Sequence, residues 1–355
     1  MPATYLMPAP LRAAIDAELA SLNTSRTEAS ARRLSDRYLA DHPASTPLLS
    51  TNDDAAAYLT TRMPATFAAI GLALEQLHDV VPTFAPTTLL DLGSGTGAAT
   101  WAAWDVFDSL THARLEDYSR PALAAADRIL EATDLTVTTR LADAAQHSAS
   151  SGGASTPANQ QPPVDLALSC YVLSELNETQ RSAVVHRLMA AANESESAAV
   201  VLVEPGTPAG YQRILIARDQ LLAAGWTIAA PCPHQGVCPV SARPGDWCHA
   251  AVRLDRSRAH RQAKGGERGY EDEKFAYVAA VRGLPLDTPD ARVLRHPITR
   301  PGHITLDLCR SDGSAGPATI SKRDGAAFRA ARKVEWGEAW GTETPPSDDR
   351  REDQS

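Results

Sequence analysis

The feature that most constrains the fold is a glycine-rich segment at residues 89–97, which reads Leu-Leu-Asp-Leu-Gly-Ser-Gly-Thr-Gly. A short apolar run precedes its glycines and an alanine-rich run follows them, so the segment predicts a strand, a tight turn and a helix. Glycine lets the chain turn sharply there and lets backbone N–H groups approach a ligand. Such a loop is weak evidence on its own. Here, however, Asp91 precedes the first glycine, and the spacing is Gly-x-Gly-x-Gly instead of the Gly-x-Gly-x-x-Gly of a dinucleotide site.

Short apolar runs alternate with helical patterns downstream of this loop, as a parallel α/β sheet requires. The expected strands are 87–92, 112–117, 137–142, 164–169 and 198–204, and the expected helices are 97–108, 120–133, 178–193 and 209–224. Apolar runs at 249–254 and 274–281 fit strands that finish the sheet. Residues 303–309 and 317–322 fit a hairpin around Asp312 and Gly313.

The Asp-x-Gly-x-Gly-x-Gly form resembles motif I of the Rossmann-like class I methyltransferases, which use S-adenosylmethionine. The resemblance implies a cofactor site at Asp91, Gly93, Ser94, Gly95, Thr96 and Gly97. It places the Asp91 carboxylate near the methionine amine, Asp117 (with Glu116 as second choice) at the ribose hydroxyls and Asp143 near adenine. A nucleotide-binding scaffold that has lost its ligand, or a different doubly wound fold, is the alternative.

No catalytic residue is evident after the fourth expected strand, where residues 169–176 read Ser-Cys-Tyr-Val-Leu-Ser-Glu-Leu. This segment differs from the Asn-Pro-Pro-Tyr type that holds a planar amino group for methylation. Cys170 could attack a pyrimidine ring, but a single small thiol at a strand end is more often a core residue. The catalytic residues therefore stay unassigned.

Four cysteines cluster in the last third of the chain: Cys232, Cys238, Cys248 and Cys309. Five, nine and sixty residues separate them in turn, so the first three can meet on one loop while the fourth must return through the fold. Four thiolates suit a structural zinc ion or an iron–sulfur cluster, and the five-residue gap, unlike the Cys-x2-Cys of most zinc ribbons, favours a cluster. His234 and His249 are possible zinc ligands, and buried cysteines without a ligand are the alternative.

Several of these segments together resemble a family, the methyltransferase-like proteins associated with the small ribosomal subunit. They are 231–239 (Pro-Cys-Pro-His-Gln-Gly-Val-Cys-Pro), 246–249 (Asp-Trp-Cys-His), 270–277 (Tyr-Glu-Asp-Glu-Lys-Phe-Ala-Tyr), 322–325 (Lys-Arg-Asp-Gly) and 331–337 (Ala-Arg-Lys-Val-Glu-Trp-Gly). The resemblance runs from about residue 58 to residue 340. It implies S-adenosylmethionine at the glycine loop, a four-iron four-sulfur cluster on the four cysteines, with zinc as the alternative, and a ribosomal RNA partner. Mitochondrial members act in small-subunit assembly, and bacterial relatives exist.

The chain is expected to divide into a helical N-terminal cap (1–80), a Rossmann-like domain (81–230), a cysteine-containing basic region that completes the sheet (231–340) and a disordered tail (341–355). Residues 11–20 and 65–77 place apolar side chains at helical spacing within the cap. The loop at 146–163 is low in complexity and is expected to carry no chemistry.

Charge is unevenly distributed along the chain, whose net charge is −9. Residues 243–335 hold 18 basic and 12 acidic residues, a local +6, so the remainder carries −15. Arg253, Arg256, Arg258, Arg261 and Lys264 form a dense basic run that can engage RNA phosphates, although a solvated face is the alternative. The first twenty residues fit neither a secretory signal nor a transit peptide, and no apolar run is long enough to span a bilayer. We therefore expect a monomeric bacterial cytoplasmic protein.

Overall fold

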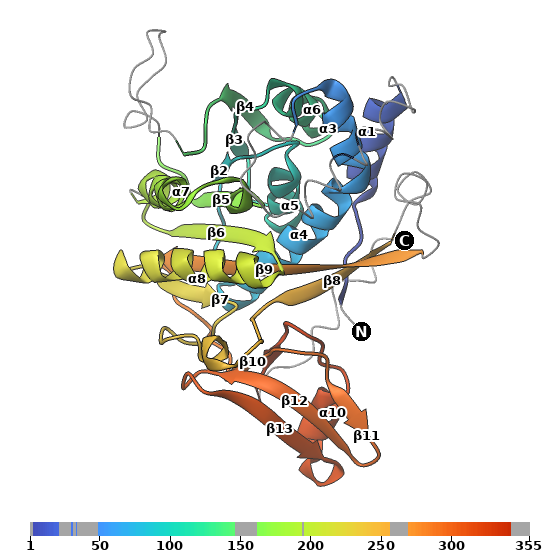
Figure 1. The fold of residues 1–355 in the computed structure, drawn as a ribbon, viewed down its shortest axis with the longest axis vertical. Coiled ribbons are helices and arrows are strands. Elements are labelled where there is room, and N and C mark those ends of the chain that lie inside the picture. Colours follow the sequence, from blue (N-terminus) through green and yellow to red (C-terminus); the bar gives the residue numbers. More distant parts are fainter. Residues whose placement is uncertain are drawn as a thin grey trace.

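The computed structural model describes residues 3–20, 30, 33, 49–145, 162–193, 195–255 and 269–341. Within these residues the strands form a large sheet of nine strands and a small sheet of five. The large sheet and its helices make up the upper part of the molecule, and the small sheet lies below them (Figure 1).

The large sheet contains β1 (Ala3–Thr4), β2 (Thr88–Leu92), β3 (His112–Asp117), β4 (Thr136–Leu141), β5 (Leu166–Cys170), β6 (Ala198–Pro205), β7 (Thr227–Ala230), β8 (Ala250–Asp255) and β9 (Tyr270–Arg282). Its order is β1-β8-β9-β6-β5-β2-β3-β4, and β7 also pairs with β9. Strands β4, β3, β2, β5 and β6 are parallel, whereas β9 runs antiparallel to β6, β7 and β8. An antiparallel strand inserted beside five parallel ones, in this order, is the topology of Rossmann-like class I methyltransferases.

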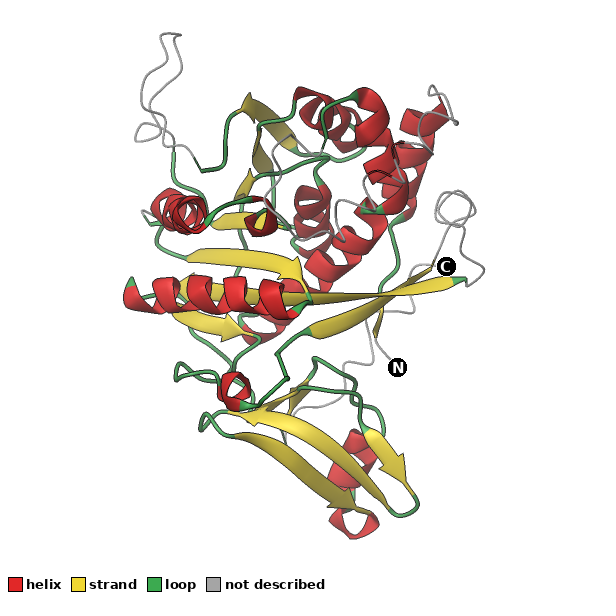
Figure 2. Ribbon diagram, viewed as in Figure 1, coloured by secondary structure: helices red, strands yellow, loops and turns green. Residues whose placement is uncertain are grey.

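Helices cover both faces of the large sheet (Figure 2). They are α1 (Ala9–Ala20), α3 (Asn52–Thr61), α4 (Met63–Val80), α5 (Ala98–Val106), α6 (Arg120–Leu130), α7 (Glu178–Ala192) and α8 (Pro208–Ala223). The residues of β6 are buried on both faces: Val201 and Val203 pack with α4 and α5, while Val200 and Leu202 pack with α7 and α8. A strand covered on both sides reads as a continuous apolar run, which explains why the sequence pattern located it.

The chain leaves β2 in one direction to form β3 and β4, then returns to the other side of β2 to form β5 and β6. The direction of winding therefore reverses between β2 and β5. In open α/β sheets, ligands bind at this reversal, in the crevice beyond the carboxyl ends of the strands. The fold thus places the glycine loop, which directly follows β2, at the expected binding position.

The small sheet contains β10 (Ala291–Val293), β11 (Ile298–Arg300), β12 (His303–Arg310), β13 (Ala315–Ser321) and β14 (Ala339–Trp340). The short helix α10 (Ala326–Ala331) packs on β12 and β13. Ile304, Leu306, Leu308 and Ile320 form its core together with Ala331 of the helix. The remaining short helices of the described chain are η2 (Leu173–Glu175), η3 (Pro239–Ala242) and η4 (Lys322–Asp324).

The predicted fold class is confirmed, and the expected strands and helices of the parallel part appear within three residues of their predicted bounds. The two finishing strands and the hairpin around Asp312 are also confirmed as β8, β9, β12 and β13. Helix α3 and the three other strands of the small sheet were not predicted. The four-part division of the chain stays a prediction.

Some predicted features lie outside the described residues. These are most of the loop at 146–163, the tail beyond residue 341, and Arg256, Arg258, Arg261 and Lys264 of the basic run. None of the helices in the described ranges has both the length and the apolar content that crossing a bilayer requires.

Candidate functional site

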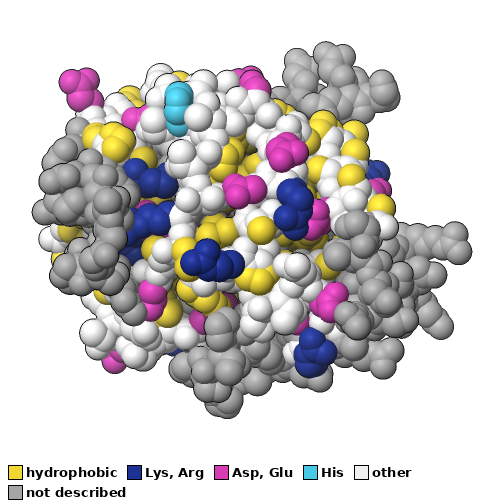
Figure 3. Space-filling model, turned by 90° about the horizontal axis from the view of Figure 1, so that it is seen from above, with side chains coloured by type: hydrophobic (Ala, Val, Ile, Leu, Met, Phe, Trp, Pro, Cys, Tyr) yellow, Lys and Arg dark blue, Asp and Glu magenta, His cyan; other side chains and the backbone are white. Residues whose placement is uncertain are grey.

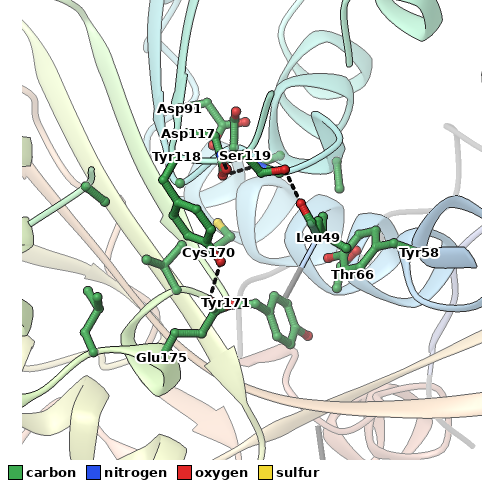
Figure 4. A pocket seen from close by; sticks show the side chains of 18 of the residues that line it. Leu49, Tyr58, Thr66, Asp91, Asp117, Tyr118, Ser119, Cys170, Tyr171 and Glu175 are labelled. Carbon is green, nitrogen blue, oxygen red and sulfur yellow. Dashed lines mark hydrogen bonds between the residues drawn. The ribbon is translucent and has the colours of Figure 1, made fainter. Parts of the chain in front are cut away.

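A pocket lies where the sheet reverses its winding. The glycine loop, the ends of β3, β4 and β5, and the helical N-terminal segment surround it (Figure 4). Its lining includes six of the predicted cofactor residues: Asp91, Gly93, Ser94, Gly95, Asp117 and Asp143. We call it the cofactor pocket.

Asp91, at the end of β2, is almost completely buried, with 1% of its surface exposed. Its Oδ2 accepts hydrogen bonds from the Thr100 backbone N–H (3.2 Å) and hydroxyl (2.8 Å), whereas its buried Oδ1 has no partner in the structure. Burial, together with the nearby Asp117, raises the pKa of Asp91 to about 7. A buried carboxylate oxygen without a donor is costly, so this position suits a cationic ligand group.

Asp117, at the end of β3, holds two loops together. Its Oδ2 accepts the N–H of Gly95 at 2.8 Å, and its Oδ1 accepts the N–H of Ser119 at 2.7 Å. Burial raises its pKa. The adjacent Glu116 points away from the pocket and pairs with Arg187 at 2.7 Å. The structure therefore brings Asp117, the first choice for a ribose contact, to the pocket and leaves Glu116 in an ion pair outside it.

The glycine loop itself adopts a conformation that other residues disfavour. Gly93, Gly95 and Gly97 all have positive φ angles, of 76°, 52° and 83°. A Cβ on Gly93 would lie 2.4 Å from a methyl carbon of Val172. Ser94 presents a buried hydroxyl without a partner to the pocket, whereas Thr96 faces Met63 of α4 and does not line the pocket.

Asp143 follows β4 and lines the far side of the pocket. Its Oδ1 accepts the N–H of Ala145 at 2.8 Å, and its carbonyl accepts a hydrogen bond from Arg187 at 3.0 Å. These bonds fix the loop after β4, so the third predicted carboxylate is held at the pocket wall.

The pocket also has walls that the sequence did not reveal. Tyr118 donates its hydroxyl to Glu175 at 2.9 Å across one side, and the Ser119 hydroxyl donates to the Leu49 carbonyl on another (Figure 4). Tyr58 of α3 completes the lining from the N-terminal segment. These contacts join segments far apart in the sequence, so only the adjacency of Tyr118 to Asp117 offered a signal.

Tyr171, just after β5, has a left-handed backbone with a φ of 62°. Such a conformation costs on the order of 1–3 kcal/mol for a residue other than glycine, and it concentrates at functional sites. It turns the buried ring into the pocket wall, where the hydroxyl donates to Glu273 at 3.2 Å. Its neighbour Cys170 also lines the pocket, and burial, with Asp91 and Glu204 nearby, raises the pKa of that thiol well above its usual value.

The four predicted metal ligands gather between the two sheets. Cys232, Cys238 and Cys248 line a second pocket, and Cys309 of β12 packs in the same buried cluster. We call this region the cysteine pocket. Among the residues that the structure describes, no group of three or more His, Cys, Asp or Glu side chains is arranged to hold a metal ion. The metal centre therefore stays a prediction.

Hydrogen-bond donors surround these sulfurs. Tyr211 donates its hydroxyl to Cys238 Sγ at 3.2 Å, and Nε2 of His234 lies 3.4 Å from Cys309 Sγ. Arg218 and Arg292 also line the pocket, and each has a buried side-chain nitrogen without a partner. Burial and the neighbouring thiols raise the pKa of Cys309 to about 12.

The sheet order and the carboxylates at the strand ends define a protein of the methyltransferase-like class. A family model described as mitochondrial small ribosomal subunit Rsm22 matches residues 52–341, and the chain belongs to this family.

Curated relatives agree with the family. The human mitochondrial ribosome assembly protein METTL17 is 28% identical over 317 residues, which cover 81% of this chain and 62% of that protein. The chain thus spans less than two thirds of that relative. The mitochondrial Rsm22-cox11 tandem protein 2 of Schizosaccharomyces pombe is 27% identical over 185 residues, or 39% of this chain and 24% of that protein.

Solved structures resemble the chain only remotely. The magnesium protoporphyrin IX methyltransferase of Synechocystis PCC 6803 with bound S-adenosylmethionine has a TM-score of 0.36 at 12% identity, covering 70% of this chain and 90% of that one. We therefore assign the fold from its strand order.

The predicted bacterial cytoplasmic location is wrong. The matching family and the curated relatives named above are all described as mitochondrial. The prediction rests on the composition of the first twenty residues, and that composition carries no information about the location of other members of the family.

Proposed function

We propose that the chain binds S-adenosylmethionine in the cofactor pocket. The observation that supports this proposal most strongly is the buried, unpartnered Oδ1 of Asp91 beside a glycine loop at the reversal of the sheet. The methionine ammonium would supply the donor that this oxygen lacks. Asp117 would receive the ribose hydroxyls and Asp143 would lie beside the adenine. Isothermal titration of the purified protein with S-adenosylmethionine tests the proposal, and an absence of binding would refute it.

We further propose that the four cysteines hold a four-iron four-sulfur cluster, with zinc as the alternative. Three of the thiols line the cysteine pocket together with Tyr211, Arg218 and Arg292, and Cys309 packs in the same buried cluster. Buried cationic and hydroxyl donors are what an anionic thiolate-bound centre requires, because hydrogen bonds to its sulfurs stabilise it. Such a centre would supply bonds that tie the two sheets together. In protein purified without oxygen, iron and acid-labile sulfide near four each per chain would support the cluster, whereas zinc without sulfide would select the alternative.

The partner that we propose is the ribosomal RNA of the small subunit, during ribosome assembly. Two observations favour it: the role named for the human relative and the local charge of +6 over residues 243–335. A basic region on an otherwise acidic chain orients its approach to a polyanion. Filter binding of the protein to small-subunit RNA in a salt series tests this proposal. Affinity that does not fall as salt rises would contradict it.

The chain either transfers a methyl group to that RNA or binds the RNA without catalysis, and these two modes of action have to be distinguished by experiment. The environment of Cys170 argues against one form of catalysis, covalent attack on a pyrimidine ring, because a buried thiol with a strongly raised pKa is a poor nucleophile at neutral pH. A small-molecule methyltransferase is less well supported, since it would leave the basic region and the cysteine pocket without a role. Transfer of a labelled methyl group to purified small subunits distinguishes catalysis from binding alone.

A further inference from the structure

The end of the small sheet farthest from the large sheet carries a concentration of exposed basic side chains. They are Arg300, Lys322, Arg323, Arg329, Arg332 and Lys333, which we call the basic tip. Between residues 314 and 334 there are five basic residues and a single acidic one, Asp324, a net charge of +4. The segments that bear them, β11 and the region from η4 to α10, lie at the bottom of the molecule (Figure 1).

The fold brings these side chains together from two segments. Arg300 ends β11 opposite His303 of β12, and the Lys322 N–H donates to the carbonyl of Gly302 in the intervening turn at 3.0 Å. The turn between β11 and β12 therefore lies directly beside η4. The basic side chains of both segments consequently share one surface.

Helix α10 adds to this surface because it is amphipathic. Its apolar residues Phe328 and Ala331 pack into the core of the small sheet. Arg329 and Arg332, three residues apart, lie on the exposed side, since residues at this spacing share a helix face. The core contacts thus fix the direction in which the arginines point.

Five side chains of the basic tip have no partner of opposite charge within the described part of the chain. Arg300, Lys322, Arg323, Arg329 and Arg332 form no salt bridge there. Asp324 is the one acidic residue between positions 314 and 334, and its Oδ2 accepts hydrogen bonds from the N–H and the hydroxyl of Ser321.

Arginines nearer the large sheet differ in this respect. Arg243 pairs with Asp307 at 2.7 Å, Arg253 with Asp272 at 2.6 Å, and Arg295 with Asp246. Basic and acidic side chains are also interspersed on the face opposite the small sheet (Figure 3). Arg300, Lys322, Arg323, Arg329 and Arg332 thus differ from Arg243, Arg253 and Arg295, whose charges are paired within the fold.

We infer that the basic tip binds the phosphate backbone of RNA, an inference that rests on the proposed RNA partner. Exposed arginine and lysine side chains from two adjacent segments can contact several phosphates at once. A protein partner would need apolar contacts at the centre of its interface. Ile298 is the single exposed large apolar side chain among the described residues of the small sheet. The surface therefore matches a polyanion better than a protein.

Two double variants of the full chain test this inference. Arg323→Gln with Arg329→Gln removes two charges from the tip. Arg12→Gln with Arg120→Gln, the distal variant, removes two exposed charges from the helices of the large sheet and therefore has the same net charge as the tip variant. Binding of both to small-subunit RNA is measured over a salt series, and Lys322→Arg serves as a charge-preserving control.

The tip variant should bind on the order of tenfold more weakly, and its log–log salt slope should fall by about 1.5, since each lost phosphate contact removes roughly 0.7–0.9. The loss should be equal on an unrelated RNA of the same length. The distal variant and Lys322→Arg should match the wild type.

If the wild type binds RNA and the tip variant binds equally well, the tip is not the contact surface while the proposed partner stands. If the wild type does not bind RNA, both are refuted. Weaker binding to subunits with unchanged affinity for naked RNA would assign the tip to a protein and overturn the inference.

Discussion

Asp91 gives the cofactor pocket a pH dependence that can be calculated. In the free protein its pKa is raised to about 7 by burial, with Asp117 as the neighbouring charge. The methionine ammonium favours the ionised carboxylate, so binding must displace the proton from Asp91 at any pH below 7. Affinity should therefore increase as pH rises through 7 and level off above it.

The size of this effect follows from proton competition. The apparent affinity is divided by one plus the ratio of protonated to ionised Asp91, which is about 30 at pH 5.5 and about 0.3 at pH 7.5. We expect S-adenosylmethionine to bind about 25-fold more tightly at pH 7.5 than at pH 5.5. This range stays below the usual α-amino pKa of about 7.7–8.0, so more than half of the ligand's amine is protonated throughout it.

Asp91→Asn removes both the charge and the titration. At pH 7.5 the variant should bind on the order of tenfold to a hundredfold more weakly, because it loses a charge-assisted hydrogen bond. Its affinity should be nearly independent of pH. Asp105→Asn is the matched control, since partial desolvation also raises the pKa of this solvent-exposed residue, but its carboxylate accepts from Tyr5 outside the pocket. Isothermal titration at four pH values measures all three proteins. Parallel pH profiles for the wild type and Asp91→Asn would refute the assignment of Asp91 as the ammonium contact.

Three further outcomes follow from other contacts. Arg213→Met leaves the fully buried Glu204 without the ion-pair partner that lies 2.7 Å away. The free energy of unfolding, measured in urea, should drop by about 3–5 kcal/mol. The double variant Arg213→Met with Glu204→Gln should lose less stability, and an equal loss would contradict this pairing. Gly93→Ala adds a Cβ that collides with Val172, on a backbone whose φ is positive. Titration should therefore show no S-adenosylmethionine binding by the variant. Wild-type affinity would disprove the loop geometry. Cys232→Ser should lower bound iron and sulfide in anaerobic preparations, whereas Cys170→Ser should leave both unchanged; equal metal content in the two variants would exclude the cysteine pocket as the site.

The centre of the parallel sheet was predictable because β2, β5 and β6 are buried along nearly their whole length and form mainly apolar runs. The small sheet was not, since β10, β11 and β14 are only two or three residues long and carry no periodic pattern. Strand β1 was missed for a different reason. It is held by pairing with Val252 and Arg253, about 250 residues away in the sequence, and nothing local marks it.

The candidate site divides in the same way. Asp91, Asp117 and Asp143 could be predicted because each follows a recognisable strand, and parallel strands bring their carboxyl ends to one edge. Tyr58 and Leu49 could not, because they reach the pocket through tertiary packing of the N-terminal segment. The charge imbalance locates the excess of basic residues within residues 243–335. A count along the sequence cannot separate the arginines that pair within the fold from those of the basic tip.

Strand β12 gives the small sheet the geometry of a lever. It runs from His303, beside the basic tip, to Cys309 in the cysteine pocket. The six residue steps from Cys309 to His303 span about 20 Å of extended strand. A rotation of about 10° at the cysteine end would displace the far end by about 3.5 Å, which is enough to carry an arginine out of hydrogen-bond range of a phosphate. The rigidity of the cysteine pocket therefore determines how precisely the side chains of the basic tip are positioned, even though no residue of that pocket belongs to the tip.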